Sequence, residues 1–221
     1  MYQNNQKTQS NECLICFEPL LKEISFVHII KSLPVCSHCL KQFKILNIHI
    51  LFHHYPLQIL YLYNTFFQSL LYQYKGLYDY ALKDTFLCLF SDELIKKYSD
   101  YVIVVAPSSQ EDNLVRGFAP MEMIAKTIHQ NVFTGLYKKE KYKQSDLRYQ
   151  DRKKMKEKIG IKNGKQLKGK KILILDDVIT SGNTLLTCLS LVLLQKPQCV
   201  ELLVLSTKKD IEVLSFDEGE K

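Results

Sequence analysis

The apolar positions in the first half of the chain have helical spacing. After Pro56 they recur every three or four residues, as in an amphipathic helix, at Leu57, Leu60, Tyr61, Asn64, Phe67 and Leu71. Gly76 ends this pattern, and a second stretch of the same kind follows at residues 78–98. We therefore expect one helix from about residue 57 to Gly76 and another over 78–98.

From residue 101 onward, continuous apolar runs replace the helical spacing. Such runs, rich in β-branched residues, occupy 101–106, 171–175 and 200–206, and they are typical of parallel strands buried on both faces. Helical patterns lie between them at 118–129 and 183–195, and the second stops before Pro197. Strands that alternate with helices predict right-handed βαβ units, so we expect an α/β fold with a mainly parallel sheet and flanking helices.

Composition limits the classes of protein to consider. The chain has 221 residues, 46% of them hydrophobic and 24% charged, which fits one globular domain plus a small module. Residues 45–74 contain no Lys, Arg, Asp or Glu, but histidines, amides and Pro56 interrupt the run too often for a membrane span. The first ten residues are polar and lack the apolar core of a secretory signal. We expect a cytoplasmic protein with no membrane insertion.

Four of the seven cysteines form two CxxC pairs. Cys13 and Cys16 are followed, after 19 residues, by Cys36 and Cys39. Each CxxC turn directs two sulfurs at one point, and zinc prefers four thiolates in a tetrahedral shell. The alternatives are four unliganded thiols or a redox dithiol, and His38 could replace one sulfur. We predict a structural zinc module at 13–45, after a flexible tail at 1–12 and before a main domain at 46–221.

Two acids and a hydroxyl-rich turn follow the strand predicted at 171–175. Asp176 and Asp177 end the apolar run, and the turn that enters the next helix carries Thr180, Ser181, Gly182, Asn183 and Thr184. A helix start offers free N–H groups to a phosphate, and glycine allows close backbone approach. Carboxylates suit ribose hydroxyls or hydrated Mg²⁺. We therefore predict a sugar-phosphate site here, and its alternative is an acid turn that binds no ligand.

This segment resembles the phosphoribosyl-pyrophosphate loop of type I phosphoribosyltransferases, and the whole layout resembles the ComF family. The residues that carry the second resemblance are Tyr74-Lys75-Gly76, Arg116-Gly117-Phe118, Gln144, Leu147 and Arg152. The resemblance implies a type I phosphoribosyltransferase-like fold for 46–221. It also implies that Asp176 and Asp177 are catalytic and contact the ribose, and that 180–184 cradle the 5′-phosphate. One departure is the acidic stretch 107–112, which would repel pyrophosphate.

Positive charge is concentrated before the acid pair. Residues 138–171 hold fifteen Lys and Arg against four acids, a local net charge of +11, whereas the whole chain carries +7. The resemblance implies a mobile hood at 138–158. Cations interleaved with tyrosines could bind pyrophosphate or single-stranded nucleic acid, and the alternative is a solvated lysine-rich face. Our candidate contacts are Arg116, Lys139, Lys141, Lys143, Arg148 and Arg152.

Two functions remain open at this point. The resemblance implies a competence protein for natural transformation, which binds incoming single-stranded DNA and couples to a helicase-like DNA-import ATPase. The alternative is an active phosphoribosyltransferase that uses Mg²⁺ and phosphoribosyl pyrophosphate with an acceptor that the residues do not identify. Preference for DNA over RNA and the oligomeric state are also left open.

Overall fold

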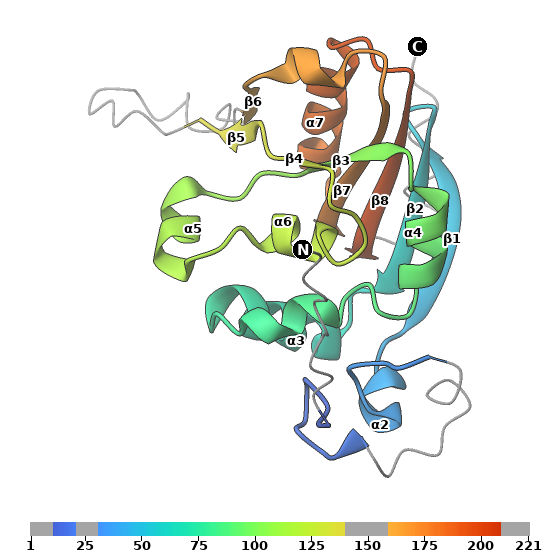
Figure 1. Ribbon diagram of the computed structural model, residues 1–221, viewed down its shortest axis with the longest axis vertical. Coiled ribbons are helices and arrows are strands. Elements are labelled where there is room, and N and C mark those ends of the chain that lie inside the picture. The colour runs from blue at the N-terminus through green and yellow to red at the C-terminus, as the bar shows by residue number, and fades with distance from the viewer. Residues whose placement is uncertain (1–10, 21–30, 140–158, 209–221) are drawn as a thin grey trace, which may run out of the picture.

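The computed structural model describes residues 11–20, 31–139 and 159–208 (Figure 1). Its main sheet has six strands in the order β1-β2-β8-β7-β3-β4. These strands are β1 (Ile45–Phe52), β2 (Tyr55–Leu62), β3 (Tyr101–Val105), β4 (Val132–Phe133), β7 (Lys171–Ile179) and β8 (Cys199–Thr207). Only β1 runs antiparallel to its neighbour, so the expected mainly parallel sheet is confirmed.

Helices cover both faces of this sheet. They are α3 (Thr65–Gly76), α4 (Ser91–Lys97), α6 (Pro120–Ala125) and α7 (Asn183–Leu193), with short 3₁₀ turns η2 (Tyr80–Asp84) and η4 (Gly164–Leu167). A further helix, α5 (Gln110–Arg116), has no buried residue. A separate antiparallel pair joins β5 (Leu136–Lys138) to β6 (Ile159–Ile161). The part of the chain that the structure describes contains no helix long and apolar enough to cross a membrane.

The strands are buried on both faces because their alternate residues enter two different cores. In β7, Leu173 and Leu175 join the core beneath α3, α4 and α6. Ile172 and Ile174 point the other way, into the core beneath α7. Side chains alternate along a strand, so a strand with helices on both faces reads as one apolar run. That is why 101–106, 171–175 and 200–206 could be recognised as strands.

The prediction of a helix beginning near Leu57 is wrong. Leu57, Leu60 and Tyr61 lie in β2, which pairs with β1 across a two-residue turn at His53 and His54. Both histidines have positive φ, as the favoured hairpin turns require, but the usual Asn-Gly signal is absent. The helix starts only at Thr65, where the Asn64 side chain accepts a 2.8 Å hydrogen bond from the Phe67 N–H.

The helix expected over 78–98 is also wrong in extent, because only η2 and α4 form there. The helix expected over 118–129 is shorter than predicted, since α6 spans Pro120–Ala125. The helix expected over 183–195 agrees closely with α7.

The N-terminal cysteine segment packs against the main sheet domain. Within its described residues, 11–20 and 31–44, the α-helix is α2 (Ser37–Leu40). Its small core of cysteines, Leu33 and Val35 includes Cys88 from the main domain, with Leu89 beside it. Lys31 and Asp92 add a 2.9 Å ion pair at the boundary. In Figure 1, α3 lies between this segment and the ends of β7 and β8.

Candidate functional site

The two acids lie near the carboxyl end of the central strand β7. Asp176 is buried, with 7% of its surface exposed, and its carboxylate accepts a 2.9 Å hydrogen bond from the Asp177 N–H. Burial, and then the negative charge of Asp177, raise the pKa of Asp176 well above its ordinary value. Ligands of open parallel sheets bind at the carboxyl ends of the strands, so the position suits a binding site.

Lys75, at the end of α3, forms an ion pair with Asp177. The two side chains retain 30% and 23% of their exposure, so the pair is largely withdrawn from water. Burial opposes ionisation of Asp177, but the ammonium outweighs burial and holds the pKa of Asp177 below its ordinary value. The two neighbouring acids therefore have pKa values shifted in opposite directions, because Lys75 pairs directly with Asp177 and has a smaller effect on Asp176.

The turn after β7 enters α7 through a glycine in the left-handed conformation. Gly182 has φ +78° and precedes the first residue of α7. A side chain at this position would also approach the Phe52 ring to 3.0 Å. Thr180, Ser181 and Asn183 are exposed around it. Their hydroxyl and amide groups and the free N–H groups of α7 can donate hydrogen bonds to an anion.

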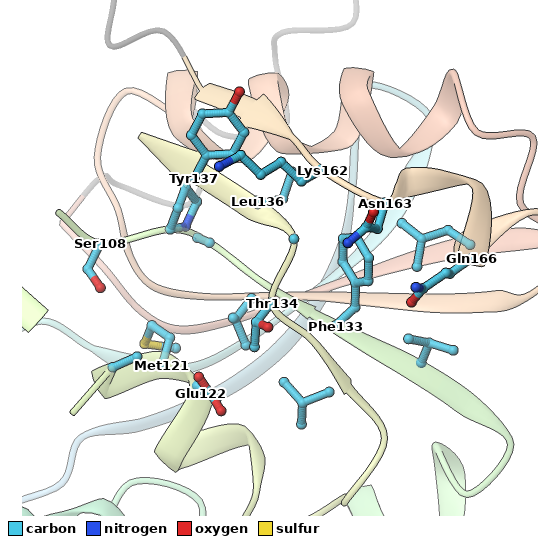
Figure 2. Close-up of a pocket in the computed structure, with 18 of the residues that line it drawn as sticks. Ser108, Met121, Glu122, Phe133, Thr134, Leu136, Tyr137, Lys162, Asn163 and Gln166 are labelled. Carbon is cyan, nitrogen blue, oxygen red and sulfur yellow. The ribbon is translucent and has the colours of Figure 1, made fainter. Parts of the chain in front are cut away.

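A cavity of about 610 Å³ opens beside Asp177. Two cations, Lys75 and Arg116, line it together with Asp112. Arg116 donates a 2.7 Å hydrogen bond from Nε to the Lys75 carbonyl and a 3.1 Å bond from Nη1 to Asn113 Oδ1. The arginine thus fixes the backbone that presents Lys75. A larger cavity of about 680 Å³ lies on the other side of α5 and contains neither acid (Figure 2).

Asp112, from the acidic stretch 107–112, lines the cavity beside Asp177. Ser109 caps α5 by accepting a 3.4 Å hydrogen bond from the Asp112 N–H. Glu111 and Asp112 then occupy the first helical turn, where carboxylates interact favourably with the helix dipole. Asp112 has a local role in the helix, but it also places a negative charge in the cavity of Asp177.

The four cysteines of the CxxC pairs come together. The sulfurs of Cys13, Cys16, Cys36 and Cys39 all lie within 4.8 Å of one another, and those of Cys16 and Cys36 are 3.5 Å apart. A tetrahedral shell with Zn–S bonds of about 2.3 Å has sulfurs about 3.8 Å apart, so the cluster has the dimensions of such a site. Backbone N–H groups of Ile15 and Cys39 point at two of the sulfurs.

Only part of the basic stretch falls within the described residues. Lys139 is exposed at the end of β5. Lys141, Lys143, Arg148 and Arg152 lie outside the described residues. The described positions of the stretch, at 138–139 and 159–171, hold seven lysines and no acid. Five of them lie at or after the end of β6: Lys162, Lys165, Lys168, Lys170 and Lys171.

Comparison with known proteins gives the family. A model of the phosphoribosyl transferase domain matches residues 92–215. The chain belongs to the phosphoribosyl transferase domain family. The match contains β7, the acid pair and the turn into α7, so the expectation drawn from Asp176–Thr184 is confirmed at the level of the domain.

This phosphoribosyltransferase-domain protein is similar to a competence protein. It is 32% identical to Competence protein ComFC of Streptococcus pneumoniae (strain ATCC BAA-255 / R6) over 123 residues, which is 56% of this chain and 55% of the relative. The chain therefore spans about half the length of the curated relative that it matches. The predicted resemblance to ComF proteins with an N-terminal four-cysteine cluster is confirmed.

Among solved structures, the chain is similar to two hypoxanthine phosphoribosyltransferases. One from Staphylococcus aureus is 17% identical, with a TM-score of 0.38, and the match covers 57% of this chain and 66% of that chain. A hypoxanthine-guanine phosphoribosyltransferase from Bacillus anthracis is also 17% identical, with a TM-score of 0.32 and coverage of 55% and 68%.

Lys75 is the site residue whose contact the sequence did not predict. The Tyr74-Lys75-Gly76 segment carries part of the family resemblance, but the neighbouring sequence does not indicate which residue Lys75 pairs with. Its partner Asp177 lies 102 residues further along the chain. Tyr74 supports the segment from within the core by donating a 2.8 Å hydrogen bond to the Pro120 carbonyl.

Proposed function

We propose that this protein is a competence protein that binds incoming single-stranded DNA in the cytoplasm and couples to a helicase-like DNA-import ATPase. The observation that carries the proposal is the 32% identity to Competence protein ComFC. The lysine-rich stretch supplies the physical means, because cations that neutralise phosphates provide most of the affinity of non-specific nucleic-acid binding. The four-cysteine module is the part proposed to dock the ATPase.

The cysteine cluster is proposed to hold a structural zinc ion. Four sulfurs leave no open position for water or substrate, so the metal would stabilise the fold and take no part in chemistry. Burial raises the pKa of both Cys36 and Cys39, so a metal must displace protons from these thiols on binding. Bound zinc would then supply folding energy to a segment whose own core is small.

The acid pair is proposed to bind phosphoribosyl pyrophosphate or a related sugar phosphate. Asp176 and Asp177 would accept hydrogen bonds from the ribose hydroxyls, and the turn Thr180–Thr184 would hold the 5′-phosphate against the start of α7. Mg²⁺, when bound with the pyrophosphate, would neutralise its charge. Arg116 and Lys75 border the cavity beside Asp177 and would add to this neutralisation.

A second candidate function is an active phosphoribosyltransferase. The acid pair and cradle at the end of β7 favour it, since these are the groups that orient the ribose while pyrophosphate leaves. Asp112 opposes it, because a carboxylate in the same cavity repels the pyrophosphate. Release of pyrophosphate from Mg-phosphoribosyl pyrophosphate in the presence of a nucleobase or amine would establish this activity.

A paired titration tests the proposal. The protein is titrated with a single-stranded oligonucleotide at two salt concentrations and, separately, with Mg-phosphoribosyl pyrophosphate. We expect DNA binding that weakens steeply with salt. No DNA binding at low salt would refute the competence role proposed here. The variant Asp177→Asn should weaken sugar-phosphate binding and leave DNA affinity unchanged, whereas equal loss of both would indicate an unfolded domain.

A further inference from the structure

The cavity of about 680 Å³ lies at the open edge of the main sheet, away from the acid pair. β4, the edge strand, pairs with β3 only at Val132 and Phe133, so on this side part of β3 has no strand beside it, whereas β7 pairs with its other side throughout. The β5–β6 pair and η4 border this space. The volume falls in the range of about 300–1,000 Å³ that is usual for small-molecule sites. We call this cavity the edge groove.

The floor of the edge groove is apolar. Val102, Phe133, Leu136 and Leu167 line it, and each is less than 9% exposed. They belong to the core beneath α7, so the floor is part of the rigid interior. A flat aromatic ring could lie on such a surface and bury its apolar faces.

The rim of the edge groove is polar and mostly exposed. Asn163 and Gln166 border it from the η4 side, with Lys162 and Lys170 beside them. Figure 2 shows Lys162, Asn163 and Gln166 on one side of the space and Ser108 and Glu122 on the other. Amide groups both donate and accept, as recognition of the edge of a base requires. Lysines suit the phosphates on either side of that base.

Electrostatics at the groove favour an anion. The rim carries Lys162 and Lys170. Both belong to residues 159–171, which contain five lysines and no acid. The carboxylate in the lining, Glu122, already has a cation, because Lys126 lies 2.6 Å from it. Lys162 also lies 4.7 Å from the centre of the Tyr137 ring, so aromatic and cationic groups meet at the rim.

The backbone around the groove is shaped to bring these groups together. A side-chain carbon at Gly135 would lie 2.3 Å from the Lys162 carbonyl, so only glycine lets the β5–β6 pair close in this way. Asn163 adopts a left-handed conformation, with φ +56°. Asparagine adopts this conformation more readily than most residues.

We propose that the edge groove binds one nucleotide of single-stranded DNA. The base would lie on the apolar floor with its edge toward Asn163 and Gln166, and the flanking phosphates would meet Lys162 and Lys170. This inference rests on the proposed function, because it locates the DNA contact of the competence protein. The groove shares no lining residue with the cavity beside Asp177, but the stretch 107–112 borders both, with Pro107, Ser108 and Gln110 at the groove and Asp112 at the cavity.

The test compares two kinds of groove variant in fluorescence-anisotropy titrations with a labelled oligothymidylate. Lys162→Gln with Lys170→Gln should weaken binding about tenfold at moderate salt and flatten the salt dependence by about 1.4 units of slope, as expected for two single-strand phosphate contacts. The matched control is Lys44→Gln with Lys96→Gln, which removes the same charge from exposed lysines outside the groove. We expect less than a twofold effect from the control.

A neutral variant separates base insertion from simple charge attraction. Gln166→Leu should weaken oligothymidylate binding about three- to tenfold with an unchanged salt slope, and it should not affect an abasic oligonucleotide of equal length. Groove variants that bind like the control pair, or a Gln166→Leu variant with unaltered affinity, would overturn the inference while leaving the proposed function intact. If the unmodified protein binds no oligonucleotide, the proposed function and the inference both fail.

Discussion

Replacing Lys75 with methionine tests the central electrostatic feature of the site. Methionine keeps most of the side-chain volume and removes the charge. Asp177 would then be a carboxylate beside the buried Asp176. It would lack the ammonium that lowers the pKa of Asp177 in the unmodified protein. Breaking a buried pair on one side costs about 3–5 kcal/mol. Because Lys75 and Asp177 keep 30% and 23% of their exposure, we expect a smaller loss of about 1–3 kcal/mol at pH 7.5.

The loss of stability should depend on pH. In the unmodified protein, the pKa of Asp177 is lower in the folded state than in the unfolded state, where it is about 3.9. Such a carboxyl stabilises the fold at pH values above the unfolded pKa, and this stabilisation is lost as the pH falls through the folded pKa. Without Lys75, the effect of burial, which raises the pKa of Asp177, loses the ammonium that outweighs it, so the pKa of Asp177 rises. Acidification to pH 5 should then protonate Asp177 in the variant, relieve the buried charge and shrink the difference from the unmodified protein.

Urea denaturation of both proteins at pH 7.5 and pH 5 measures this difference. The cysteine cluster is common to the two proteins, so its own pH dependence cancels. Lys171→Met is the control, because Lys171 pairs with Asp100 and these side chains keep 36% and 59% of their exposure, and exposed pairs contribute about 0.5 kcal/mol or less. A loss for Lys75→Met that equals the control, or that is the same at both pH values, would refute the proposed role of Lys75 in holding Asp177 ionised.

Three further predictions concern other parts of the chain. Cys16→Ser should lower the zinc content of the protein, measured by atomic emission. Cys199 is an exposed cysteine outside the cluster, so Cys199→Ser should leave the zinc content unchanged. Equal zinc content in the two variants would contradict the zinc site. Gly182→Ala should destabilise the protein by about 2 kcal/mol, because a left-handed alanine costs about 1–2 kcal/mol and the new methyl meets a ring. Gly169→Ala has the same backbone strain in open space, so calorimetry should show a smaller loss, and equal losses would refute the steric argument. Glu201→Gln should lower stability at pH 7 and much less below pH 4, since Lys97 and two tyrosine hydroxyls outweigh burial and keep the pKa of Glu201 low; an equal loss at both pH values would exclude this.

The features that could be predicted were those encoded by neighbouring residues. The CxxC spacing brought four sulfurs together as expected, because each turn positions two of them locally. The strand, acid pair, turn and helix at 171–193 also follow one another directly in the chain. In each case the signal comes from residues that are close in the sequence, either the two cysteines of one turn or a strand and the turn that follows it.

The failures involved partners far apart in sequence. Residues 57–62 have spacing that fits a helix or a strand, and the structure makes them a strand because Leu57 pairs with Leu202 of β8. No local pattern carries that pairing. Lys75 likewise meets Asp177 only because α3 lies across the carboxyl end of the sheet. Its position at the end of a helix gave no indication of a buried acid as its partner.

The two cavities of the main domain are separate but physically connected through α5. Asn113 lines the edge groove and accepts a hydrogen bond from Arg116, which lines the cavity of the acid pair. Arg116 in turn holds the carbonyl of Lys75, whose ammonium meets Asp177. A chain of contacts transmits a signal only if its members have two alternative arrangements. Displacement of Lys75 from Asp177 by ribose hydroxyls would be such a rearrangement, because it changes the charge balance at one end of this chain. The proposed DNA-binding groove and the proposed sugar-phosphate site would thus be linked by a continuous set of contacts through which one ligand could influence the other.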